Sequence, residues 1–152
     1  MELSVDQIME KLRSGKVSKE ELWNYLQSSN KDVKHEAWVT AQKMIERKHS
    51  LLLDFLCFPD HGTRYRAWNL FQDFMNEFDR EVINSRTGCL LEMLRDEDLN
   101  VRRLTWYVTL PRVLQYLDVN IVKQLVRYCE EVAVDEWKEL IEDTCRELGL
   151  MR

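Results

Sequence analysis

The stretch Asp98-Leu99-Asn100-Val101-Arg102-Arg103-Leu104-Thr105-Trp106 decides the fold. It has the pattern of a turn that opens a helix. An acid stands at the start, Val101 begins an apolar face, and Thr105 and Trp106 lie one turn further on. Residues 30–38 (NKDVKHEAW) and 60–68 (DHGTRYRAW) match it position by position. Self-similarity of this kind is typical of stacked helical repeats.

The three copies share Asp or Asn at the turn, Lys or Arg four residues later, then Ala or Thr, then Trp. Trp38 and Trp68 are 30 positions apart, Trp68 and Trp106 are 38 apart, and Trp137 follows 31 positions later. A pair of leucines precedes each of the three copies. Each repeat therefore reads as a shorter first helix, a turn, and a longer second helix.

These repeats predict a single domain over residues 1–152. Its parts are an N-terminal capping helix at 1–15, repeat 1 at 18–47, repeat 2 at 50–78, repeat 3 at 81–117, and a degenerate repeat 4 or C-terminal cap at 118–150. We interpret the end parts as caps because a stack of repeats needs terminal units with a polar outer face.

Local signals predict the helix ends. Ser4 with Gln7 and Ser18 with Glu21 are capping boxes, and Gly15 should stop the first helix. Pro111 should kink or break its helix near Thr109. Other expected helices are 32–47, 63–78, 81–95 (loosened around Thr87-Gly88), 99–117 and about 134–148, the last ending at Gly149.

The composition favours an all-α protein, because 4 Gly and 2 Pro in 152 residues are few breakers for a chain that is 45% hydrophobic. No apolar run approaches the roughly 18 residues of a membrane span. The N-terminus lacks a basic region followed by an apolar block, so no signal peptide is expected.

The four cysteines, Cys57, Cys89, Cys129 and Cys145, are scattered and form no CxxC pair. We therefore expect reduced thiols that fill a helical core, rather than zinc ligands or disulfides. Reduced thiols and the lack of a signal peptide predict a cytoplasmic location.

The net charge of −5 is uneven. Residues 31–117 carry 13 basic and 13 acidic side chains, whereas residues 118–152 carry 9 acids and 5 bases. No strongly basic footprint of a nonspecific nucleic-acid binder is present, although a local basic stripe stays possible.

The repeated pattern resembles the HEAT-repeat family, in which an Asp-bearing turn precedes a Val-Arg-x-x-Ala second helix. The matching residues are Asp60, Arg64 and Ala67; Asp98, Val101, Arg102 and Thr105; and, more loosely, Asn30, Val33, Lys34 and Ala37. The resemblance implies a short right-handed α-α superhelix of about nine helices, with the second helices along the inner curve. The family's usual first-helix proline is missing, and armadillo-like and other α-solenoid families remain open.

The repeated residues have structural interpretations. The turn acid of one unit can meet the base at the helix start of the next unit, which would give a ladder of charge-assisted hydrogen bonds. This ladder would use Lys34, Asp60, Arg64, Asp98 and Arg102. The tryptophan column should pack in the core, with ligand stacking as the alternative.

The second helices should expose the face opposite their apolar stripe, and the resemblance places this face on the concave surface. We expect a non-enzymatic scaffold that binds a protein or peptide there. The side chains of this face mix aromatic, amide and cationic groups, a composition typical of protein interfaces. The expected partner-binding residues are His35, Tyr65, Arg66, Asn69, Arg103 and Tyr107. The alternative is nucleic-acid binding or alkylated-base repair in a HEAT-like groove. Whether Leu104, Val108 and Leu114 are buried or form an apolar patch stays open.

No motif in the chain indicates catalysis. GxGxxG, Walker, HExxH and GxSxG patterns are absent, and the three histidines lack the spacing of metal ligands. We therefore expect no enzyme activity, no cofactor and no metal. The sequence does not define an oligomeric state.

Overall fold

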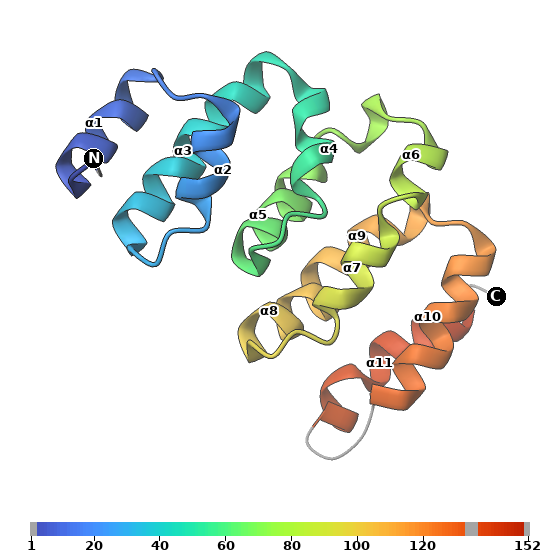
Figure 1. Cartoon of the computed structure of the whole chain (residues 1–152). Helices are drawn as coiled ribbons and strands as arrows, with labels where there is room; N and C mark the ends of the chain where they lie inside the picture. The colour runs from blue at the N-terminus through green and yellow to red at the C-terminus, as the bar shows by residue number, and fades with distance from the viewer. Residues whose placement is uncertain (1–2, 133–136, 151–152) are drawn as a thin grey trace. The chain divides into compact units, whose positions relative to one another are not determined.

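The computed structural model describes residues 3–132 and 137–150, and within these ranges every regular element is helical (Figure 1). The predicted all-α class is confirmed for these residues. The chain divides into two compact units, Met1–Arg64 (unit 1) and Tyr65–Arg152 (unit 2). The boundary falls inside helix α5 (His61–Phe71), within predicted repeat 2. That residues 1–152 act as a single domain stays a prediction.

Unit 1 begins with the two predicted capping boxes. Its elements are α1 (Val5–Ser14), α2 (Lys19–Leu26), α3 (Lys31–Arg47), the 3-10 turn η1 (His49–Leu51), α4 (Leu52–Phe55), and the first residues of α5. The Gln7 amide donates to Ser4 Oγ (3.2 Å), and the Glu21 amide donates to Ser18 Oγ (3.1 Å). Gly15 ends α1 at φ 74°, where a residue with a Cβ is disfavoured.

The core of unit 1 forms where α1 and α2 pack on α3. Leu22, Leu26 and Ala37 are fully buried there. The Thr40 hydroxyl donates to the Leu12 carbonyl (3.1 Å), which joins α3 to the end of α1. Lys11 and Glu21 form an ion pair between α1 and α2. These contacts fix α3, which carries the first copy of the repeated stretch.

Unit 2 continues α5 into several short helical elements and two longer helices, α10 and α11. They are η2 (Met75–Glu77), α6 (Arg80–Asn84), α7 (Thr87–Met93), α8 (Leu99–Leu104), the π-helical segment η3 (Thr105–Thr109), α9 (Leu110–Val113), η4 (Leu114–Tyr116), α10 (Val119–Val132) and α11 (Trp137–Leu150). The elements are shorter and more numerous than expected, because several predicted helices are interrupted.

Two predicted helix ends in unit 2 are wrong. The helix expected over 63–78 ends at Phe71. The ring of Phe78 instead packs on that of Phe71, with centroids 5.2 Å apart. The predicted loosening near Thr87 is confirmed as a break between α6 and α7. Gly149 lies inside α11 rather than ending it, and the expected start near Val134 lies outside the described residues.

The predicted distortion before Pro111 is confirmed, and it takes the form of a π-helical segment rather than a break. Pro111 has no N–H and cannot donate to the carbonyl four residues earlier. The preceding turn, η3, widens to the π pattern, and α9 then begins with Pro111 in its first turn. A single run of helix therefore continues from α8 to α9 with an altered turn at Trp106.

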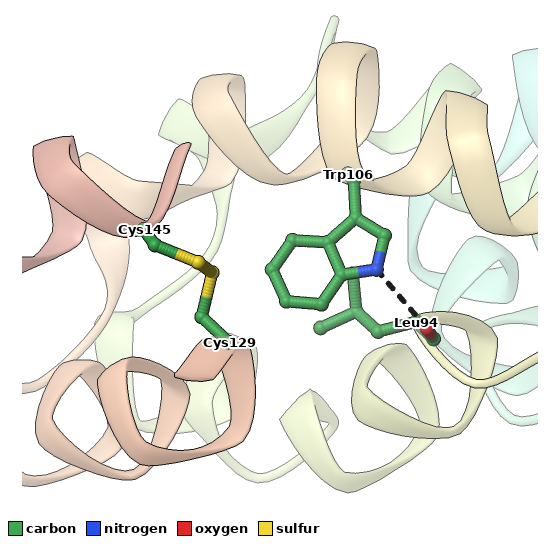
Figure 2. The surroundings of a disulfide bond; sticks show 4 residues. All are labelled: Leu94, Trp106, Cys129 and Cys145. Carbon is green, nitrogen blue, oxygen red and sulfur yellow. Dashed lines mark hydrogen bonds between the residues drawn. A yellow bond between two sulfur atoms is a disulfide. The ribbon is translucent and has the colours of Figure 1, made fainter. Parts of the chain in front are cut away.

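The expected tryptophan column is confirmed as core. Trp38 is 7% exposed, and Trp68 and Trp106 are fully buried. The indole N–H of Trp106 donates to the Leu94 carbonyl (3.1 Å), so this buried donor is satisfied by the first helix of its own repeat (Figure 2).

The expectation of reduced cysteines is wrong. Cys129 on α10 and Cys145 on α11 form a disulfide with Cα atoms 5.5 Å apart (Figure 2), and no cysteine in the described part of the chain is a free thiol. The core position of Cys129 was predicted correctly, because its side chain is fully buried. The sequence carries no signal for this pairing. The two cysteines are 16 residues apart, and their sulfurs meet only because α10 and α11 pack side by side.

Two further expectations concern the chain as a whole. No helix within the described ranges combines the length and apolar character that a membrane span requires. Within predicted repeat 4, residues 133–136 lie outside the described residues.

Candidate protein-interaction surface

Each second helix starts on a capped turn, and the cap is the Asp or Asn of the repeated stretch. The Asn30 side chain accepts from the amides of Asp32 and Val33. Asp98 accepts from the amides of Asn100 (2.9 Å) and Val101 (3.3 Å). Asp60 likewise accepts from the amide of Thr63, as described next. These residues therefore satisfy helix-start donors, which fixes where the second helices begin.

An acid–base pair between repeats is present at Lys34 and Asp60, but its order is the reverse of the predicted one. Lys34 Nζ lies 2.5 Å from Asp60 Oδ1, with the base supplied by the earlier repeat and the acid by the later one. The other carboxylate oxygen accepts from the amide and hydroxyl of Thr63, both at 2.9 Å. Burial alone would raise the pKa of Asp60, but the hydrogen bonds from Lys34 and Thr63 outweigh burial and lower that pKa.

The two arginines at the matching position bind backbone carbonyls. Arg64 Nε donates to the Phe58 carbonyl (2.9 Å), and Arg102 Nε donates to the Asp96 carbonyl (3.0 Å). Arg64 is buried, at 6% exposure. Each arginine thereby holds the turn that precedes its helix, so both belong to the scaffold and not to a surface.

The six predicted partner-binding residues divide between the two units. His35 lies in unit 1, where it is exposed on α3. Arg66, Arg103 and Tyr107 are exposed in unit 2, whereas Tyr65 and Asn69 are half-buried there.

Asn69 joins two second helices of unit 2. Its side-chain oxygen accepts from the hydroxyl of Thr109 (2.9 Å) and from the side-chain Nε2 of Gln72 (3.2 Å). The oxygen of Gln72 in turn accepts from Arg112 (2.6 Å). Thr109 is fully buried, so its hydroxyl depends on Asn69 as a hydrogen-bond partner across α5 and η3. This bond gives Asn69 a structural role that the sequence analysis missed.

Arg103, Leu104 and Tyr107 form a mixed surface on consecutive turns of α8 and η3, which we name the Tyr107 patch. Leu104 and Tyr107 are each 38% exposed, and Arg103 is exposed beside them. Of the side chains whose burial the sequence left open, Leu104 is thus exposed, Val108 is half-buried, and Leu114 is buried. The patch offers a cation, an aliphatic group and an aromatic ring within one short helical run.

The phenol of Tyr107 is the most perturbed group of this patch. Partial burial raises the pKa of Tyr107. The nearby Arg103 opposes that rise, and the carboxylate of Asp143 on α11 adds to it. The phenol therefore stays protonated and can donate a hydrogen bond.

Unit 1 carries a concave feature between α1 and α3, which we name the α1–α3 groove. Its volume is about 700 Å³. It is lined by Val5, Asp6, Met9, Glu10, Arg13, Asp32, His35 and Glu36. Four carboxylates face one arginine, whose Nε lies 3.7 Å from a Glu36 oxygen. The groove thus combines negative charge with apolar side chains, a lining suited to a cationic side chain of a partner.

Of the groove residues, sequence analysis identified only His35. A signal was present: Asp6 with Glu10, and Asp32 with Glu36, are acid pairs spaced by four residues. Like charges at this spacing weaken a helix. Only the packing of α1 on α3 brings the two pairs to one groove.

No group of three or more His, Cys, Asp or Glu side chains in the described ranges could hold a metal ion. No family model, no curated protein and no solved structure matches this chain.

Proposed function

We propose that this protein is a non-enzymatic scaffold that binds a protein or peptide through its second helices. In this proposal the repeats stack as a short right-handed α-α superhelix of the HEAT type. Support comes from the recurring capped turn and from the bond of Asn69 with Thr109 between neighbouring second helices. A further support is the arginine–carbonyl contact that Arg64 and Arg102 both make.

The observation that carries the proposal is the exposure of the Tyr107 patch. Tyrosine and arginine are enriched among the residues that anchor interfaces, and here Tyr107, 38% exposed, lies beside an exposed arginine and an exposed leucine. The helices below it are held by buried side chains such as Trp106. Such a surface loses little conformational freedom on binding.

The α1–α3 groove supplies a second contact of the same function. Its carboxylates favour a partner segment that bears lysine or arginine, and the apolar side chains of Val5 and Met9 offer contact to the aliphatic part of that segment. His35 lies at this groove and is the one predicted binding residue of unit 1.

Nucleic-acid binding is the alternative. Arg66 and Arg103 are exposed and could contact phosphates, with Tyr107 for base stacking. The acidic lining of the α1–α3 groove disfavours a polyanion there. The salt dependence of binding separates the two functions, since phosphate contacts weaken steeply as salt rises.

The cytoplasmic location stays a prediction. Its argument from reduced thiols is lost, because the Cys129–Cys145 disulfide is a bond that oxidising compartments favour.

Photo-crosslinking from defined positions tests the proposal. A photoreactive amino acid replaces Arg103 in the Tyr107 patch or, as a matched control, Lys123, which is exposed on α10. Each protein is irradiated in extract from the cells that express it, with and without nuclease. We expect a discrete protein adduct from position 103 that resists nuclease and is absent from position 123.

The adduct should also disappear when Tyr107→Ala is added. Equal labelling from both positions, or none from position 103, would show that the patch is not a binding surface. An adduct lost with nuclease would support the nucleic-acid alternative.

A further inference from the structure

The Cys129–Cys145 disulfide joins the two helices that end the described chain. Cys129 on α10 is fully buried, whereas Cys145 on α11 is half-buried. Their Cα atoms are 5.5 Å apart, within the usual range for a disulfide. The bond therefore ties α11 to α10, and Cys145 is the more exposed of its two residues.

Helix α11 also packs against η3, the segment that carries Tyr107. Thr144, next to the half-cystine of α11, is buried at 6% exposure. Asp143, the residue before it, lies close enough for its charge to act on the Tyr107 phenol. Figure 2 shows the buried ring of Trp106, the neighbour of Tyr107, in the surroundings of the disulfide. The disulfide and the Tyr107 patch are thus connected through α11.

We propose that the Cys129–Cys145 disulfide is a redox-sensitive latch that keeps α11 on η3, so that its reduction loosens α11 and enlarges the exposed surface around Tyr107. The part of this inference that concerns partner access rests on the proposed binding function of the patch. The structural part, the loosening of α11 on reduction, can be tested without any partner.

The reducing step is a thiol–disulfide exchange with an external dithiol. A thiolate of the dithiol attacks Sγ of Cys145, because the sulfur of Cys129 is buried. The S–S bond breaks, and Cys129 leaves as a thiolate that takes up a proton. The second thiol of the reagent then attacks the mixed disulfide and releases Cys145 as a thiolate. The reagent becomes a disulfide, and the protein gains two electrons and two protons.

Hydrogen exchange of the full chain measures the latch. Oxidised protein is compared with protein that has been reduced by dithiothreitol and alkylated, which locks the thiols. We expect the amides of α11 to exchange on the order of 100-fold faster after reduction, the factor implied by removing a crosslink over a loop of this length. Acetylation of Tyr107 by N-acetylimidazole should rise severalfold, while that of Tyr65 on α5 stays unchanged.

The double variant Cys129→Ser, Cys145→Ser is the control, because reductant also acts on any other disulfide of the chain. Without reductant it should already show the fast exchange of α11, and reductant should change neither readout. Unchanged α11 exchange in the reduced natural chain, or a response to reductant that persists in the variant, would overturn the latch. If both readouts respond but no adduct forms from position 103, the latch stands and the proposed function fails.

Discussion

Arg64 and Arg102 stand at the same position of two repeats, and each donates its Nε–H to the carbonyl oxygen six residues earlier in the chain. The accepting residues, Phe58 and Asp96, are both buried. A carbonyl in such a place needs a partner, because a buried unpaired polar group is costly. The arginine recurs at this position because its Nε–H binds the buried carbonyl of the turn before the second helix.

Replacing Arg64 by alanine should destabilise the protein. The loss should be about 1.5–3 kcal/mol, because a charged donor is removed and the Phe58 carbonyl loses it as a partner. Arg66→Ala is the matched control on the same helix, since Arg66 is exposed. Its effect should stay within about 0.5 kcal/mol. Urea unfolding followed by circular dichroism measures both, and equal stabilities of the two variants would contradict this role.

The Lys34–Asp60 pair should make stability depend on pH. The pKa of Asp60 in the folded protein lies below its ordinary value of 3.8. The contribution of the ionised carboxylate is therefore fully present above pH 3.8 and is lost as the pH falls through the lower folded pKa. Thermal unfolding of the natural chain and of Asp60→Asn should differ at neutral pH and converge in acid. A constant difference down to about pH 2 would rule out this linkage.

Asn69 and Thr109 should be energetically coupled. Asn69→Ala leaves the buried Thr109 hydroxyl without this partner. Thr109→Val removes the hydroxyl itself, so no buried donor at position 109 is left to pair. A double-mutant cycle by chemical unfolding should give a coupling of about 0.5–1.5 kcal/mol. Additive effects would mean that the bond does not contribute to stability.

The buried tryptophans should be visible in fluorescence. Trp106→Phe removes the indole N–H that binds the Leu94 carbonyl, and we expect a loss of about 1–3 kcal/mol in the free energy of unfolding. The signal that Trp106→Phe removes from the folded protein should be blue-shifted and resistant to acrylamide quenching, because Trp106 is fully buried. Loss of a red-shifted, easily quenched component would contradict the buried position.

Removing a carboxylate from the α1–α3 groove should weaken binding of a cationic peptide without lowering stability. Glu10→Gln relieves the repulsion from Asp6 on the same helix face, so stability should be unchanged or higher by a few tenths of a kcal/mol. Binding of a lysine-rich peptide, measured by fluorescence anisotropy at low salt, should weaken. Unaltered peptide affinity would show that the groove does not bind cations.

Signals local in the sequence predicted much of the fold. Ser4, Ser18 and Pro111 act within a few residues of their own position, so the capping boxes and the distorted helix could be read from the chain. The disulfide, the Asn69–Thr109 bond and the α1–α3 groove each need two helices to meet. Periodicity indicates which face of a helix is apolar, but it does not fix the neighbour that a given side chain meets.

The same difference between local signals and contacts across helices holds for the candidate surface. The exposure of Arg103 and Tyr107 followed from their place opposite the buried face of their helix. That Asn69 is held by Thr109 did not follow, because its partner is 40 residues away in the sequence. Asp143 likewise reaches Tyr107 from a different helix.

The short reach of the contacts in unit 1 has a kinetic consequence. Ser4 and Gln7 are three residues apart, Lys11 and Glu21 are ten apart, and even Lys19 and Asp54 are separated by only 35. Closing such loops sacrifices little chain entropy, and proteins dominated by contacts of this kind cross their folding barrier quickly. We therefore expect these N-terminal helices to assemble on the microsecond-to-millisecond scale, with α3 as the element on which the others condense.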